Sequence, residues 1–184
     1  MVTDHERERQ GVWQNEGVAM SRVASVLTAT VLVILIQGWT AGASPTHAPN
    51  VVLQQADGTP VPLASYAGRV LLVDFWASWC IPCKTSFPAL DALFREYKGR
   101  GLEVLAVNLD EDRRHADAFL SAHPHQMPVL FDPKGAAPLA FGVKGMPTSF
   151  LIDKTGTIRF THMGYSGNVD VRYRQEIAAL LSEK

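Results

Sequence analysis

The sequence predicts an α/β protein in which helices cover both faces of a mixed β-sheet. The first observation is a short, mostly apolar run at 70–76, typical of a buried strand. The second is the recurrence of apolar residues at helical spacing directly after it, from Phe87 to Tyr97. The third is that strand-like and helix-like segments keep alternating almost to the end of the 184-residue chain. Together these patterns favour one α/β domain.

The later elements follow from the same patterns, taken in chain order. A buried strand is expected over 102–109, and Asp110, Glu111 and Asp112 are expected to cap a helix near 113–122. The remaining predictions are a strand at 129–131, a helix at 136–141 closed by Gly142, hairpin strands at 149–152 and 158–163, and a closing helix at 169–181. The residues predicted to face inward are Ala116, Phe119 and Leu120 on the first of these helices, and Val171, Ile177, Leu180 and Leu181 on the last.

Both cysteines of the chain lie in a single Cys-x-x-Cys motif, Cys80 to Cys83. Pro82 falls in the first turn of the predicted helix, where its missing N–H costs nothing. Cys80 is therefore expected at the helix N-terminus, where unpaired N–H groups and the helix dipole favour a thiolate. We predict Cys80 as the attacking nucleophile and Cys83, one turn further and less exposed, as the resolving thiol. An inert pair or half of a zinc site is the alternative, although no second cysteine pair is present to complete four zinc ligands.

Two motifs resemble the thioredoxin superfamily. The run Val73–Lys84 resembles its active-site strand, turn and helix, and Gly145-Met146-Pro147-Thr148 resembles the segment that carries a cis-proline facing the disulfide. Within the superfamily, about residues 50–181 resemble the TlpA/ResA-like branch. The resemblance implies a thioredoxin-like fold with an extra N-terminal β-hairpin near 50–69 and a central insertion that includes 128–132.

The chain departs from that branch at two positions near the cysteines. Ser86 stands where the branch usually carries Glu, and Asp74 stands where it often carries Asn. Asp74 is what thioredoxins place there, and a buried carboxylate can accept and return the proton of the resolving thiol. We predict this acid–base role for Asp74, with a purely structural buried Asp as the alternative. The Lys that thioredoxins place near this Asp matches Ala106, so the local charge differs.

The predicted substrate-binding surface surrounds the cysteine pair and consists of Trp79, Ile81, Pro82, Met146 and Pro147. The cis bond that the resemblance implies would leave the Met146 backbone open to pair with an extended substrate segment. Trp79 is expected to form an apolar lip, whereas Trp76 is expected in the core. Because Ile81 offers no charge to a Cys80 thiolate, we expect the reduction potential of the cysteine pair to lie on the low, reducing side of the range for the superfamily.

The first part of the chain predicts export. Residues 23–36 form an apolar stretch followed by Ala41-Gly42-Ala43, which predicts a signal peptide at 20–43 or an uncleaved N-terminal membrane anchor. Residues 1–19 are acidic, unlike a signal n-region, and are interpreted as an extension from a start codon assigned too early. A linker is expected at 44–49 and the thioredoxin-like domain at 50–184. The expected location is periplasmic or otherwise extracytoplasmic.

The composition of the chain argues against nucleic acid as a partner, and its histidines do not predict a metal site. The formal net charge is −1 and no basic stripe is visible, so nucleic acid is a poor candidate partner. His123 and His125, with His115 nearby, are interpreted as loop residues rather than metal ligands, and His162 is expected at the surface or half-buried. We expect no metal and no cofactor beyond a redox-active Cys80–Cys83 disulfide.

The predicted function is an exported thiol–disulfide oxidoreductase that reduces protein disulfides. It would receive electrons from a membrane thiol donor, and the resemblance suggests cytochrome c maturation as one setting. The first alternative is a peroxiredoxin-like peroxidase, although residues 77–80 lack the Thr of the Thr-x-x-Cys turn. The second is a non-enzymatic copper-binding chaperone that uses both cysteines and a histidine.

Overall fold

The computed structural model describes residues 46–183. The predicted extension at 1–19 and the predicted signal peptide or anchor at 20–43 lie outside the described residues. Among residues 46–183, no helix is long and apolar enough to cross a membrane.

One mixed sheet forms the centre of the domain, in the strand order β2-β1-β5-β4-β3-β6-β7. The strands are β1 (Val52–Gln54), β2 (Pro60–Pro62), β3 (Val70–Trp76), β4 (Leu102–Asn108), β5 (Val129–Phe131), β6 (Thr148–Ile152) and β7 (Ile158–Met163). The central strands β3, β4 and β5 are parallel, whereas β6 and β7 on one side, and β1 and β2 on the other, pair antiparallel. The predicted mixed sheet is confirmed.

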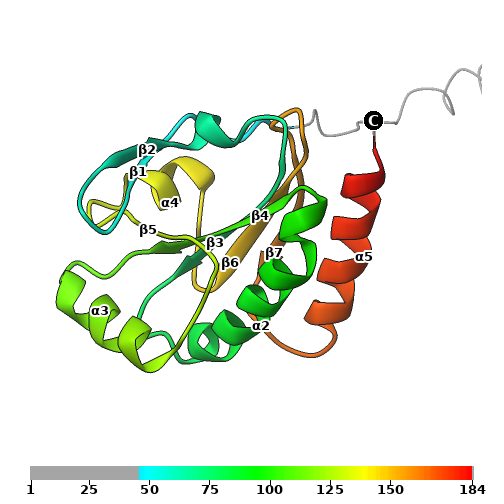
Figure 1. Ribbon diagram of the computed structural model, residues 1–184. Helices are drawn as coiled ribbons and strands as arrows, with labels where there is room; N and C mark the ends of the chain where they lie inside the picture. The colour runs from blue at the N-terminus through cyan, green and yellow to red at the C-terminus, as the bar shows by residue number, and fades with distance from the viewer. Residues whose placement is uncertain (1–45, 184) are drawn as a thin grey trace, which may run out of the picture. The chain divides into compact units, whose positions relative to one another are not determined.

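Helices cover both faces of this sheet, as predicted (Figure 1). They are η1 (Leu63–Tyr66), α2 (Ile81–Tyr97), η2 (Lys98–Arg100), α3 (Arg113–Ala122), α4 (Ala136–Phe141) and α5 (Val169–Ser182). Apolar residues of α2 and α5, with Phe119 of α3, form one core cluster against the sheet. The second cluster contains Leu63 of η1 together with Ala137 and Phe141 of α4. Burial on both faces explains why the central strands are apolar almost throughout.

The alternation of side chains along β3 decides which face carries the chemistry. Leu72 and Trp76 belong to the cluster under α2, whereas Leu71 and Phe75 belong to the cluster under α4. Asp74 lies between Leu72 and Trp76 in this two-residue period, so its side chain points to the α2 face. The strand therefore places one carboxyl group beneath the helix that carries both cysteines.

The N-terminal hairpin and the central insertion implied by the resemblance are both present. β1 pairs with β2 around a turn, and β5, within the insertion, joins β1 to β4. Before them, Thr46 O accepts from Ile158 N and Ala48 N donates to Gly156 O, both at 2.9 Å. This part of the predicted linker is thus hydrogen-bonded to the β6–β7 turn through its backbone. Such backbone pairing does not depend on apolar side chains, so an apolar pattern in the sequence could not predict it.

Two side chains lie elsewhere than predicted. Val171 is 54% exposed instead of facing inward, because the buried stripe of α5 runs through Val169, Tyr173 and Ile177, and Val171 lies about 200° around the helix from Val169. His162, predicted at the surface or half-buried, is buried, and its Nε2 lies 2.6 Å from Oε2 of Glu176 in α5.

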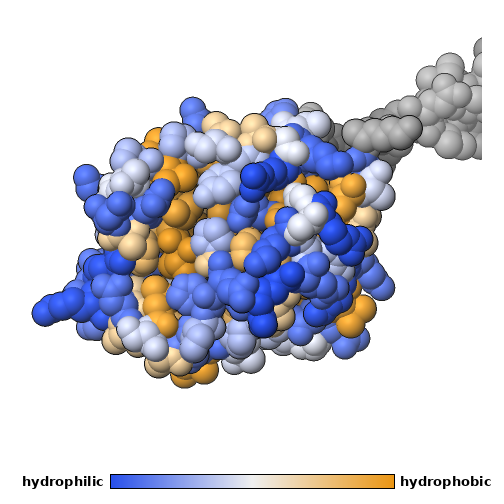
Figure 2. Space-filling view, in the orientation of Figure 1, coloured by the Kyte–Doolittle hydropathy of each residue, from blue (hydrophilic) through white to orange (hydrophobic). Residues whose placement is uncertain are grey.

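The exterior on one face is largely hydrophilic, with hydrophobic patches over α4 and β5 (Figure 2). Leu139 of α4 is among the exposed large apolar side chains. Isolated apolar residues of this kind are ordinary on a protein surface. The apolar residues beside the cysteines differ because they surround a reactive group.

Candidate active site

Cys80 and Cys83 form a disulfide at the start of α2, with their Cα atoms 5.2 Å apart. Cys80 is the N-cap residue and its Sγ accepts a hydrogen bond from Cys83 N at 3.3 Å. Pro82 lies in the first turn, as predicted. Cys80 retains 6% exposure and Cys83 none, so the order of accessibility is also the predicted one. The helix N-terminus supplies unpaired N–H groups to Cys80, which stabilises a thiolate there.

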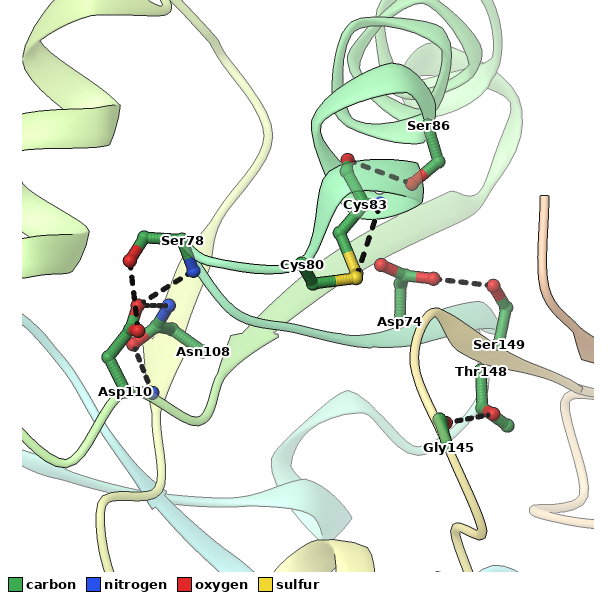
Figure 3. Close-up of a disulfide and its surroundings, with 10 residues drawn as sticks. All are labelled: Asp74, Ser78, Cys80, Cys83, Ser86, Asn108, Asp110, Gly145, Thr148 and Ser149. Atoms are coloured by element: carbon green, nitrogen blue, oxygen red, sulfur yellow. Dashed lines mark hydrogen bonds between the residues drawn. A yellow bond between two sulfur atoms is a disulfide. The ribbon is translucent and has the colours of Figure 1, made fainter.

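Asp74 lies beneath the disulfide and is 1% exposed (Figure 3). Its Oδ1 accepts a hydrogen bond from Ser149 Oγ at 2.6 Å. Burial raises the pKa of Asp74 to about 7, and the hydrogen bond from Ser149 opposes this rise. A carboxyl group with a pKa near neutrality can take up and release a proton at physiological pH.

The Met146–Pro147 peptide bond is cis, as the resemblance implies. The loop is fixed at both ends, since Thr148 Oγ1 donates to Gly145 O at 2.7 Å and Gly164 N donates to Pro147 O at 2.8 Å. Met146 and Gly145 face the cysteine turn across a shallow groove of about 440 Å³. The groove is lined by Trp79, Cys80, Ile81, Pro82, Gly145 and Met146. Pro147, predicted to belong to the substrate-binding surface, is buried and does not line the groove.

Trp79 is an exposed apolar side chain at this site. It is 66% exposed, and Ile81 beside it is 77% exposed. A second hollow lies on the other side of Trp79, lined by Ser78, Trp79, Lys84, His115, Ala118 and Phe119. Trp76, in contrast, is buried and packs against Phe87 with ring centroids 5.0 Å apart. The two tryptophans therefore occupy the predicted surface and core positions.

Neither Ser86, which departs from the branch, nor Ala106, which departs from thioredoxins, adds a charge near Asp74. Ser86 is buried and its Oγ donates to Cys83 O at 3.1 Å, within the helix. Ala106 lies directly opposite Asp74 on β4 and contributes no charge. Asp74 is thus the ionisable side chain that the strand places under the cysteines.

A polar cluster that the sequence did not reveal fixes the turn before Cys80. Asp110 is buried and accepts from Ser78 N and Ser78 Oγ, both at 3.0 Å, and from Asn108 Nδ2 at 2.8 Å (Figure 3). The sequence predicted Asp110, Glu111 and Asp112 as caps of α3; Asp112 is the N-cap, whereas Asp110 belongs to this cluster instead. The sequence feature that could have predicted this cluster is the polar residues just after β4. Because β3 and β4 are parallel, their carboxyl ends lie at the same edge of the sheet, which brings Asp110 close to Ser78.

Replacing Asp110 is expected to test this cluster. Asp110→Ala leaves the donors of Ser78 and Asn108 without an acceptor, so the free energy of unfolding should fall by about 3 kcal/mol. Asp110→Asn is the matched control, because its amide can accept from Ser78 N and Asn108 and donate to Ser78 Oγ. Urea unfolding of both variants measures the difference. Equal loss in the two variants would contradict the hydrogen-bonding account.

The histidines that raised the question of metal binding have protein partners. His123 stacks on Phe119 at a centroid distance of 3.9 Å, and its Nδ1 lies 2.7 Å from Phe119 O. His125 Nδ1 lies 3.0 Å from His123 O. In the part of the chain that the structure describes, no three His, Cys, Asp or Glu side chains gather in a way that could hold a metal ion.

Comparison with known proteins places this geometry in a family. The Redoxin family profile matches residues 42–176. The chain is 32% identical over 137 residues to the thiol-disulfide oxidoreductase ResA of Geobacillus thermodenitrificans (strain NG80-2), covering 74% of this chain and 79% of the relative. It is also 32% identical over 113 residues to the protein of that name from Bacillus subtilis (strain 168), covering 61% of this chain and 63% of the relative.

Solved structures agree with these relatives. A Chlorobium tepidum protein assigned as the thiol:disulfide interchange protein DsbE superposes with a TM-score of 0.72 and 43% identity, over 75% of this chain and 97% of that chain. A thiol:disulfide interchange protein of the thioredoxin family from Chlorobium tepidum TLS gives a TM-score of 0.67 and 26% identity, over 77% of this chain and all of that chain. With a Cys-x-x-Cys disulfide at a helix N-terminus, a cis-proline loop facing it and these relatives, the chain belongs to the Redoxin family and is a thiol–disulfide oxidoreductase.

Proposed function

We propose that this oxidoreductase works as a reductant of protein disulfides, with Cys80 as nucleophile, Cys83 as resolving thiol and Asp74 as the acid–base group. The observation that carries the proposal is how the three residues lie in depth: Cys80 is the more accessible cysteine, Cys83 is fully buried in the first turn of α2, and the Asp74 carboxyl lies beneath the disulfide (Figure 3). Each residue then has the access that its step requires.

In the first step the Cys80 thiolate attacks one sulfur of a substrate disulfide. A Cys80–substrate disulfide forms, and the other substrate sulfur leaves as a thiolate. In the second step Asp74 takes the proton of Cys83, and the Cys83 thiolate attacks Cys80 Sγ. The Cys80–Cys83 disulfide forms, the second substrate sulfur leaves, and two electrons have passed to the substrate. Asp74 later returns its proton when the pair is reduced again.

The proposed docking surface is the groove beside Cys80. Met146 borders it next to the cis-proline, where we expect an extended substrate segment to add as a strand. Trp79, Ile81 and Pro82 offer apolar contact on the opposite side. An unfolded or extended stretch around a cysteine fits this surface better than a rigid folded one, because the attacked sulfur must reach a nearly buried Cys80.

The reducing direction is supported by the charges around Cys80. A reductant holds its disulfide form stable relative to the dithiolate, and strong oxidants do the reverse by stabilising the thiolate. Ile81 contributes no charge to Cys80, and Asp74 adds a negative charge when it ionises. Both features work against a strongly depressed thiol pKa at Cys80.

We expect the reduction potential of the Cys80–Cys83 pair to lie near the thioredoxin value of about −270 mV rather than near the about −120 mV of strong oxidants. Equilibration with glutathione or dithiothreitol buffers, followed by alkylation of free thiols, measures it. An Ile81→His variant provides the comparison, since a cation next to Cys80 should raise the potential. A wild-type value near the oxidising end would mean that the protein introduces or shuffles disulfides.

We further propose that the protein acts outside the cytoplasm and is kept reduced by a membrane thiol donor. The apolar stretch at 23–36 and the small residues at 41–43 support export or anchoring. A reductant in an oxidising compartment needs an outside source of electrons, since glutathione there does not supply them. Cytochrome c maturation is one setting for such a reductant, although Ser86 replaces the Glu of the resembling branch.

A further inference from the structure

A line of three buried polar side chains runs from the disulfide to the C-terminal helix. Asp74 of β3 and Ser149 of β6 are direct partners in the antiparallel register, and Ser149 Oγ lies 2.6 Å from Asp74 Oδ1. On its other side, Ser149 Oγ lies 2.8 Å from the hydroxyl of Tyr173 of α5. All three side chains are at most 2% exposed. The line is therefore sealed from bulk water by the sheet and α5.

The number of protons fixes the direction of these hydrogen bonds. An ionised carboxylate can only accept, and each hydroxyl has one proton to donate. When Asp74 is ionised, Ser149 donates to Asp74, so Ser149 must accept from Tyr173. A donor that itself accepts a hydrogen bond is polarised and donates more strongly. Among the residues that the structure describes, Ser149 is the only side chain that donates to Asp74, and Tyr173 strengthens that hydrogen bond through Ser149.

The side chains around this line, some titratable and some neutral, come from several elements. His162 of β7 is the register partner of Ser149, and its ring lies 4.7 Å from that of Tyr173 in an edge-to-face contact. Glu176 of α5 is paired with His162. On the other side of Asp74, β4 contributes Ala106, and α2 contributes Cys83 and Ser86. Ser149 therefore remains the side chain that donates to Asp74.

The two oxygens of Asp74 face different partners. Figure 3 shows one oxygen directed to Ser149 and the other on the side of the disulfide. We propose that Tyr173, acting through Ser149, is a positioning residue of the exchange reaction: it holds one Asp74 oxygen so that the other stays directed at the Cys83 sulfur for proton transfer. This inference rests on the proposed acid–base role of Asp74.

The test uses Tyr173→Phe in the full chain, which keeps the ring against His162 and removes only the hydroxyl. The rate at which Cys83 resolves a mixed disulfide is measured against pH, and the Asp74 carboxyl is titrated by ¹³C NMR. Without the Tyr173 hydroxyl, Ser149 should donate less strongly to Asp74. The midpoint of the Asp74 titration should then rise by about half a pH unit, and the part of the rate profile that follows this titration (the limb) should rise with it. Ser149→Ala, which removes the hydrogen bond itself, should move both by about one unit or more.

Two variants serve as controls. Tyr165→Phe removes a hydroxyl that is bonded to Asp170 rather than to this line, and should leave the limb in place. In an Asp74→Asn background, Tyr173→Phe should have no further effect on the profile.

The outcomes separate this inference from the function on which it rests. If Asp74→Asn removes the limb but Tyr173→Phe leaves it at the wild-type pH, or slows the reaction equally at every pH, the positioning role is wrong and the proposed role of Asp74 stands. If Asp74→Asn itself leaves the limb unchanged, both are wrong.

Discussion

A Cys83→Ser variant is expected to accumulate covalent complexes with its protein substrates. Cys80 remains nucleophilic at the N-cap of α2 and still forms the mixed disulfide, but the buried thiol that resolves it is missing. Turnover should fall by more than about a thousandfold, because two residues that act in sequence cannot replace one another. Electrophoresis without reductant should show the complexes, and mass spectrometry of the released partners identifies the substrates.

Cys80→Ser is the matched control. It should lose turnover to the same extent and trap nothing, because Cys83 has no exposed surface from which to attack a substrate. Trapping by Cys80→Ser instead of Cys83→Ser would reverse the assigned roles. Trapping by both would mean that the burial of Cys83 does not limit its access.

Asp74→Asn is expected to stabilise the protein at alkaline pH. Burial raises the pKa of Asp74 from 3.8 to about 7. A carboxyl group whose pKa is raised on folding favours the folded state at pH values below the unfolded pKa, and this contribution is lost as the pH rises through the folded pKa. A shift of about three units corresponds to about 4 kcal/mol. The amide introduced by the substitution stays neutral and can still accept from Ser149, so the variant avoids this loss.

The measurement is urea unfolding of the oxidised full chain at two pH values. At pH 8.5 the variant should be more stable than the wild type by about 4 kcal/mol, and at pH 4 by less than about 1 kcal/mol. Asp153→Asn provides a contrast, because the burial that would raise the pKa of Asp153 is outweighed by hydrogen bonds from Thr155, Thr157 and Arg159, which lower it. That variant should lose stability above pH 4. An Asp74→Asn advantage that does not change with pH would contradict a raised pKa.

This stability cost supports a functional reason for Asp74. An aspartate that destabilises the folded protein at physiological pH is expected to be retained only where its proton has a use. The proposed use is the proton of Cys83, whereas the turn-fixing carboxylate Asp110 contributes to stability instead. Two buried aspartates near one disulfide thus have opposite energetic roles.

Local patterns in the sequence determined the secondary structure and the reactive pair. The spacing of apolar residues, together with the capping residues, predicted helix and strand positions close to those observed. The spacing of Cys80 and Cys83, directly before the predicted helix, predicted a disulfide at the helix start. These features depend on neighbours within a few residues, which the sequence displays directly. The strand order and the cis-proline came from resemblance to a family, not from the pattern.

Only the tertiary structure decided which polar groups meet. Ser78 and Asp110 are 32 residues apart, Asp74 and Ser149 are 75 apart, and Ser149 and Tyr173 are 24 apart. The first two contacts depend on how β3 lies beside β4 and β6, and the third depends on the rotation of α5, which also exposes Val171. Such contacts have no local periodicity, because hydrogen bonding between distant side chains is selected by the packed geometry of the sheet. The sequence by itself therefore determined the Cys80–Cys83 pair at a helix start, and the fold determined which polar side chains lie beneath it.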